Sequence, residues 1–107
     1  MRILIADDAS DAREILRRLL KRRRHEVVTA SNGREARGIL ERESIRLMIS
    51  DWMMPEIDGP ELCRRVRSAQ WGHYVYFILL TARYDKEDLI EGMTAGADDL
   101  LKKSFNF

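Results

Sequence analysis

The stretch Leu47-Met48-Ile49-Ser50-Asp51-Trp52-Met53-Met54-Pro55-Glu56-Ile57-Asp58-Gly59 decides the fold and points to a site. Residues 47–49 are apolar, which is typical of a strand buried on both faces of a sheet. Pro55 and the pair Asp58-Gly59 then interrupt the pattern and indicate a loop. Asp51 is therefore expected at the carboxyl end of a central strand, where open α/β sheets bind their ligands. A carboxylate there can serve as a nucleophile, a metal ligand or a helix cap.

Length, charge and cysteine content describe an ordinary small domain. A chain of 107 residues is expected to form one domain with a single core over residues 1–107. A formal net charge of +1 gives no general attraction to nucleic acid. The single cysteine, Cys63, excludes an intramolecular disulfide and is expected to be a packing residue. Strand-like sequence begins at Arg2, and no apolar run approaches about 20 residues, so we expect a cytoplasmic protein without a signal peptide.

The rest of the chain alternates between short apolar runs and segments with helical spacing. Helix starts are predicted from an N-cap at Ser10, a proline in the first turn at Pro60 and an N-cap at Asp85. Gly96 is expected to close the last of these helices. This alternation predicts an α/β fold, with a parallel five-stranded sheet doubly wound by helices on both faces. The expected strands are residues 3–6, 27–29, 47–49, 74–80 and 99–101.

Polar residues follow several of these strands. Asp7-Asp8 follow the first, Asp51 the third, Thr81 the fourth and Lys103 the fifth. Because parallel strands end at one edge of a sheet, we expect these side chains to lie on that edge. If the first and third strands are neighbours, three carboxylates converge, and they cannot all stay ionised unless a cation joins them. Oxygen ligands without histidine or cysteine favour Mg²⁺. A nucleophilic carboxylate, a metal, a hydroxyl and an ammonium group together indicate phosphoryl transfer to aspartate.

With these motifs in this order, the chain resembles the receiver domains of two-component response regulators, of the chemotaxis-receiver type, over nearly its whole length. The resemblance implies a flavodoxin-like strand order 2-1-3-4-5. It rests on four groups of residues, namely Asp7-Asp8, the stretch 51–59, Leu80-Thr81-Ala82, and Ala95-Gly96-Ala97-Asp98-Asp99 followed by Lys103-Ser104-Phe105.

The resemblance implies a Mg²⁺ site on the aspartates. Asp8 and Asp51 would bind the metal directly, together with the backbone carbonyl of Met53. Asp7 would contribute through water.

The resemblance also implies a function for the site. Asp51 would accept a phosphoryl group from the phosphohistidine of a histidine kinase or phosphotransfer protein. Lys103 would pair with that group, and Thr81 would move toward it. The domain would catalyse only its own phosphorylation and dephosphorylation, and would act as a switch for an output domain or partner protein.

Three features depart from the family pattern. Ser104 follows the lysine where the family has a proline in a cis peptide bond, and we expect a trans bond here because the cis form costs about 3–4 kcal/mol without proline. Leu100 replaces the usual tyrosine or phenylalanine, which predicts a muted switch or one that is read out elsewhere. The chain stops at Phe107, before the family's fifth helix. We expect the missing helix to leave an apolar strip open, which a partner chain, such as a second copy in a homodimer, or an altered packing would cover.

Two other functions remain open from the sequence. An aspartate-nucleophile phosphatase expects a second aspartate two residues after the nucleophile, where this chain has Met53. A pseudo-receiver would bind partners without phosphate. The basic run of residues 17–24 is interpreted as a solvated helix face, and direct nucleic-acid binding is not expected.

Overall fold

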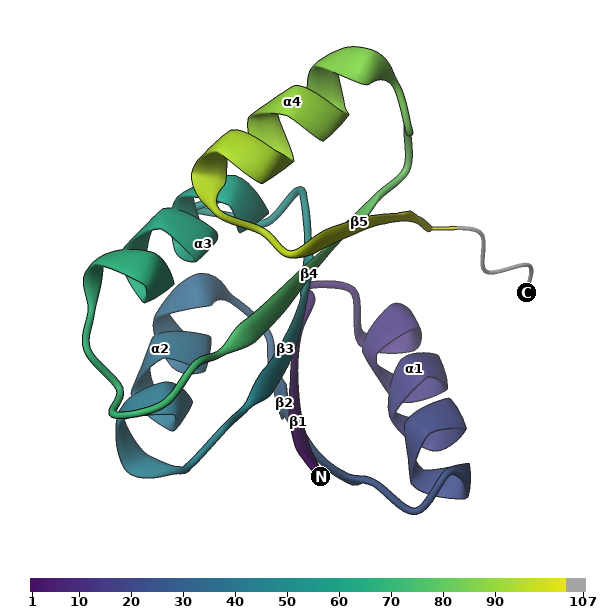
Figure 1. Ribbon diagram of the computed structural model, residues 1–107. Helices are drawn as coiled ribbons and strands as arrows, with labels where there is room; N and C mark the ends of the chain where they lie inside the picture. The colour runs from purple at the N-terminus through teal and green to yellow at the C-terminus, as the bar shows by residue number, and fades with distance from the viewer. Residues whose placement is uncertain (104–107) are drawn as a thin grey trace.

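The computed structural model describes residues 1–103 and contains five parallel strands and four helices (Figure 1). The sheet has the order β2-β1-β3-β4-β5, which confirms the predicted fold class and strand order. The last described element is β5, and the expected peptide geometry at Ser104 lies outside the described residues. The elements are β1 (Arg2–Ala6), α1 (Ser10–Arg22), β2 (Glu26–Ala30), α2 (Gly33–Arg42), β3 (Leu47–Asp51), α3 (Gly59–Ser68), β4 (Tyr76–Thr81), α4 (Lys86–Ala95) and β5 (Asp99–Lys102).

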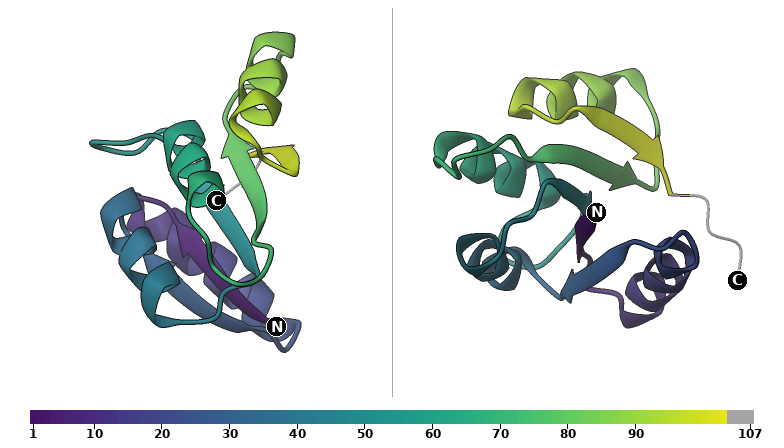
Figure 2. Two further views of the ribbon diagram at one scale, coloured as in Figure 1. Left: turned by 60° about the vertical axis from the view of Figure 1, so that its left-hand side comes forward. Right: turned by 60° about the horizontal axis from the view of Figure 1, so that its bottom comes forward.

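The helices cover the two faces of the sheet unequally. Helices α2, α3 and α4 lie on one face and α1 lies on the other (Figures 1 and 2). The larger core lies beneath the three helices and includes Phe77, Leu79, Leu100 and Cys63, all fully buried. Cys63 is thus a packing residue, as predicted.

The face beneath α1 has a smaller core. It joins strand residues Ile3, Ile5, Ile49 and Leu80 to side chains of α1. In β5, Leu101 is 45% exposed, while the neighbouring Leu100 is buried in the larger core. Within residues 1–103, no helix has both the length and the apolar content needed to cross a membrane.

Three of the four helices begin at a side-chain cap. Asn32, Asp58 and Asp85 each accept a hydrogen bond from the backbone N–H three residues later. The cap predicted at Asp85 is therefore confirmed. So is the helix end at Gly96, whose left-handed φ of 106° suits glycine.

Two predicted boundaries are wrong. Helix α1 has its N-cap at Ala9 rather than Ser10, and no side chain caps it. Instead the Asp7 carboxylate accepts the N–H of Ala9 at 2.9 Å and stabilises the turn between β1 and α1. Strand β4 begins at Tyr76 rather than Tyr74, because its partner β3 begins at Leu47, which pairs with Tyr76.

An ion pair and several hydrogen bonds around Asp98 connect α3 to the start of β4 and to the turn before β5. Its carboxylate pairs with Arg67 at 2.7 Å and accepts the backbone N–H of Phe77 at 2.8 Å. The Arg67 guanidinium also donates to the carbonyls of Gly96 and Val75, at 2.8 and 2.7 Å. Asp98 therefore supports three segments that lie far apart in the sequence.

Replacing Asp98 with asparagine is expected to lower the free energy of unfolding by about 1–2 kcal/mol, because a charge-assisted bond to Arg67 becomes a neutral one. Urea denaturation measures the change. The control is Glu41→Gln, which breaks an exposed pair with Arg37 at 3.7 Å and should cost about 0.5 kcal/mol or less. Equal stability of the two variants would contradict the role given to Asp98.

Candidate functional site

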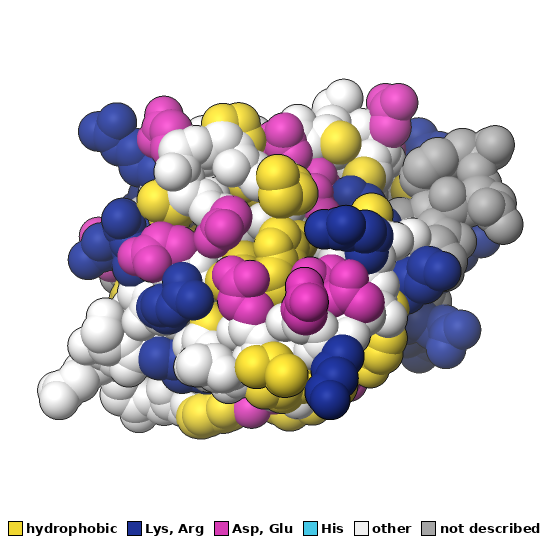
Figure 3. All heavy atoms as spheres, turned by 90° about the horizontal axis from the view of Figure 1, so that it is seen from above, with side chains coloured by type: hydrophobic (Ala, Val, Ile, Leu, Met, Phe, Trp, Pro, Cys, Tyr) yellow, Lys and Arg dark blue, Asp and Glu magenta, His cyan; other side chains and the backbone are white. Residues whose placement is uncertain are grey.

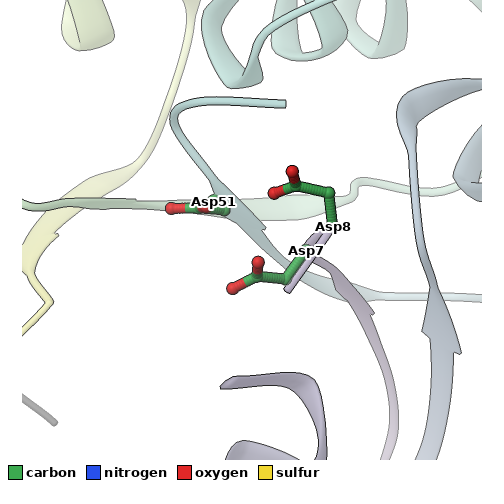
Figure 4. Close-up of side chains that lie close together, drawn as sticks. All are labelled: Asp7, Asp8 and Asp51. Carbon is green, nitrogen blue, oxygen red and sulfur yellow. The ribbon is translucent and has the colours of Figure 1, made fainter. Parts of the chain in front are cut away.

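The predicted acidic residues meet at the carboxyl ends of the two central strands. Parallel pairing of β1 with β3 places Ala6 beside Ser50, so Asp7 and Asp8 follow β1 next to Asp51 at the end of β3. One carboxylate oxygen from each aspartate lies within 4.8 Å of the others. Figure 4 shows the three side chains extending to the same side of the strand ends. Asp7 is buried, Asp51 is half-buried and Asp8 is exposed.

Lys103 brings a positive charge to this cluster. Its Nζ lies 2.9 Å from Asp7 Oδ2 and 3.4 Å from Asp51 Oδ2. The residue follows β5, and its backbone N–H donates to the carbonyl of Thr81, the last residue of β4. The structure therefore brings together the lysine and the acidic residues that the sequence placed on one edge.

Burial and charge act in opposite directions on Asp51. Burial, and next the charge of Asp7, raise the pKa of Asp51 above its ordinary value of 3.8, while Lys103 and the N–H of Trp52 work to lower it. Burial lowers the pKa of Lys103, but its hydrogen bond to Asp7 and the charge of Asp51 outweigh that effect and raise it. The lysine is thus held in its charged form beside a carboxylate that is costly to ionise.

The aspartate cluster fits a small divalent cation. Octahedral Mg²⁺ binds oxygen at about 2.0–2.1 Å, so opposite ligands lie about 4.2 Å apart. Neighbouring ligands lie about 2.9 Å apart in that geometry, so three oxygens within 4.8 Å of one another can close around one such ion by side-chain movement. All three side chains offer oxygen, the donor that Mg²⁺ prefers. Acidic side chains also gather near the middle of the face seen from above, with basic side chains around them (Figure 3).

A cavity of about 230 Å³ opens beside Asp51. Its volume is sufficient for a phosphoryl group and ordered water. Met53, whose carbonyl was expected to be a metal ligand, stands at the cavity with a side chain that is 72% exposed. The walls are formed by Asp51, Trp52, Met53, Thr81, Ala82 and Lys103, with Arg83 and Asp88 from the side of α4.

The Thr81 hydroxyl is directed toward α4. It donates to Asp88 Oδ2 at 3.3 Å and accepts the backbone N–H of Arg83 at 3.2 Å. Sequence reasoning missed Asp88 as a residue of this site. The sequence feature that could have identified Asp88 is its position in the first turn of the helix that follows Thr81, three residues after the cap at Asp85.

Trp52 links Asp51 to the larger core. Its backbone N–H donates to Asp51 Oδ1 at 3.0 Å and to the carbonyl of Leu80 at 2.8 Å. Its half-buried indole packs on the core beneath α4. Trp52 is therefore a partly exposed residue at the rim of the site.

Comparison with known proteins identifies sequence relatives over nearly the whole chain. The sequence profile of the response regulator receiver domain matches residues 3–107. The response regulator MprA of Mycolicibacterium vanbaalenii is 40% identical over 105 residues, which cover 98% of this chain and 45% of that protein. The chain thus spans about half the length of such curated relatives. A 14.6 kDa protein of Leptolyngbya boryana is 42% identical over 96% of this chain and 79% of its own length.

Solved structures agree with these relatives. The chemotaxis protein CheY4 of Vibrio cholerae superposes with a TM-score of 0.92 at 31% identity, over 98% of this chain and 88% of that one. The response regulator TrrA of Thermotoga maritima, solved in complex with Mg²⁺-BeF, gives a TM-score of 0.83 at 38% identity, over 99% of this chain and 89% of that one. With a matching profile and relatives of this similarity, the chain belongs to the response regulator receiver domain family.

Proposed function

We propose that this domain is the phosphoacceptor of a two-component signalling system, and that Asp51 carries the phosphoryl group. The observation that supports this most directly is the clustering of Asp7, Asp8 and Asp51, with Lys103 beside Asp7 and Asp51, next to a cavity of phosphoryl size. Such a cluster provides a nucleophile, a place for a divalent cation and a fixed positive charge.

In the proposed transfer, a carboxylate oxygen of Asp51 attacks the phosphorus of a phosphohistidine. The oxygen–phosphorus bond forms as the phosphorus–nitrogen bond to the histidine breaks. Lys103 lies 3.4 Å from Asp51 Oδ2 and would favour the ionised carboxylate before transfer and pair with the phosphoryl oxygens afterwards. Thr81, which lines the same cavity, would turn its hydroxyl toward the new group.

Mg²⁺ is the proposed cofactor. Asp8 and Asp51 would hold it directly, with the backbone carbonyl of Met53, and Asp7 would act through water. When bound, the metal would neutralise the negative charge of the carboxylates and the phosphoryl oxygens. The close approach of the three aspartates supports this assignment.

The domain would act as a switch rather than as an enzyme on a separate substrate. Its proposed donor is a histidine kinase or phosphotransfer protein, and its proposed location is the cytoplasm. Its proposed target is an output domain or partner protein, in keeping with relatives of about twice its length. The proposed partner for the face on which Leu101 is exposed is a second copy of the chain, in a homodimer.

The test is intact-mass spectrometry after incubation with acetyl phosphate and Mg²⁺. We expect one phosphoryl group per chain, and none when EDTA removes the metal. Folding is checked by circular dichroism in both samples. A folded protein that takes up no phosphoryl group with Mg²⁺ present would overturn the proposal in favour of a pseudo-receiver.

A further inference from the structure

The Thr81 hydroxyl is hydrogen-bonded to α4 and to the loop before it, and within residues 1–103 it makes no hydrogen bond to Asp51. Thr81 is only 4% exposed, so its hydroxyl depends on protein partners. Its proton goes to Asp88 Oδ2 at 3.3 Å, and its oxygen accepts the N–H of Arg83 at 3.2 Å. A threonine hydroxyl has one proton, and Asp88 therefore competes with any acceptor that forms on Asp51.

Asp88 is well placed for this competition. Its backbone N–H donates to the cap residue Asp85 at 2.8 Å, which fixes the first turn of α4. Its carboxylate lines the same cavity as Asp51 and Lys103. Within residues 1–103, no ion pair joins Asp88 to a lysine or arginine, so its negative charge stays available to Thr81.

One turn later, α4 touches the site again. A methyl group placed on Gly92 would lie 3.6 Å from the Trp52 indole and 3.3 Å from Leu79. Residues 88 and 92 are one helical turn apart and share a face of α4. This face therefore contacts both the switch threonine and the neighbour of Asp51.

We propose that Asp88 is a latch on Thr81, which holds the hydroxyl toward α4 until a phosphoryl group on Asp51 draws it away. The proposal rests on the proposed function of Asp51. Release of the latch breaks the bond between the end of β4 and the first turn of α4, and so transmits the state of Asp51 to this helix. Asp88 is a positioning residue, because it acts through Thr81.

The experiment measures the affinity of the Mg²⁺-loaded protein for beryllofluoride, a phosphoryl analogue, by tryptophan fluorescence. Asp88→Ala is expected to bind about three- to tenfold more tightly than the parent chain. The long Thr81–Asp88 distance places the effect toward the lower end of that range. The matched control is Glu87→Gln, which removes a charge from the same helical turn without touching Thr81, and should leave the affinity unchanged.

A double-mutant cycle separates the latch from simple charge repulsion. In a Thr81→Val background, the effect of Asp88→Ala should vanish if Asp88 acts through the hydroxyl. An equal gain in both backgrounds, or no gain in the single variant, would overturn the latch.

A readout without phosphate keeps this test separate from the proposed function. In the ligand-free protein, three-bond NMR couplings of Thr81 should report one fixed χ1 rotamer, and averaging over rotamers in Asp88→Ala. If the parent chain bound no beryllofluoride, the proposed function would fall, and these couplings would still decide whether Asp88 restrains Thr81. Unchanged couplings in Asp88→Ala would overturn the latch.

Discussion

The Asp51→Asn protein is expected to take up no phosphoryl group from acetyl phosphate and Mg²⁺, while the parent chain takes up one. An amide lacks the anionic oxygen that attacks phosphorus, and neither Asp7 nor Asp8 ends β3 beside the cavity as Asp51 does. Intact-mass spectrometry provides the measurement. Asp8→Asn is the companion variant, because it keeps the nucleophile and should show slowed uptake that added Mg²⁺ partly restores. Stoichiometric uptake by Asp51→Asn would show that another residue is the acceptor.

The same substitution is expected to raise the thermal midpoint of the metal-free protein. Burial and the charge of Asp7 raise the pKa of Asp51 above 3.8, so the folded state binds its proton more tightly than the unfolded chain does. Ionisation therefore costs stability, and this cost appears as pH rises through the raised pKa. Asparagine cannot ionise, and its advantage should be absent below pH 3.8 and present at neutral pH.

Thermal unfolding, followed by circular dichroism at several pH values, tests whether Asp51→Asn stabilises the metal-free protein at neutral pH and not below pH 3.8. Mg²⁺ should stabilise the parent chain more than the variant, because a ligand stabilises the state that binds it. A variant that is less stable than the parent chain at neutral pH without Mg²⁺ would contradict the electrostatic account.

The fold was predictable because its signals are local and repeat along the chain. Apolar strands, the cap at Asp85 and the glycine at Gly96 each follow from a few neighbouring residues. The placement of Asp7, Asp8, Asp51 and Lys103 on one edge followed from parallel strand ends alone. The strand order depended on the family resemblance, since alternation by itself leaves the order open.

Other features depend on contacts that sequence spacing does not reveal. The cap predicted at Ser10 failed because the carboxylate of Asp7, the residue after β1, stabilises the turn instead. The start of β4 shifted because pairing with β3, a strand more than 20 residues earlier, begins only at Leu47 and Tyr76. The direction of the Thr81 hydroxyl depends on how α4 docks, and so Asp88 was not foreseen.

Replacing Gly59 with alanine is expected to destabilise the fold by about 3 kcal/mol and to disturb Asp51 at the same time. A Cβ atom at this position would lie 2.5 Å from the Asp51 carbonyl oxygen, 2.6 Å from Leu79 Cδ2 and 3.1 Å from Trp52 Cα. Two of these atoms belong to the backbone, and a hydrogen bond from the N–H of Gly59 to the carbonyl of Trp52 at 2.7 Å resists separation of the two segments. Overpacking that cannot relax through side chains is strongly destabilising.

Gly38 offers the matched control for this prediction. It lies within α2, and an added Cβ would meet only the flexible end of Arg42, at 3.2 Å. Gly38→Ala should therefore stabilise the protein by up to about 1 kcal/mol, through helix propensity and a less flexible unfolded chain. Urea denaturation measures both variants, and acetyl phosphate uptake shows whether Asp51 has moved. Because the Gly59 clash falls on the carbonyl of Asp51 itself, phosphoryl uptake should slow in Gly59→Ala even under conditions where the protein stays folded. A Gly59→Ala protein as stable and as quickly phosphorylated as the parent chain would show that the loop after β3 does not position the acceptor.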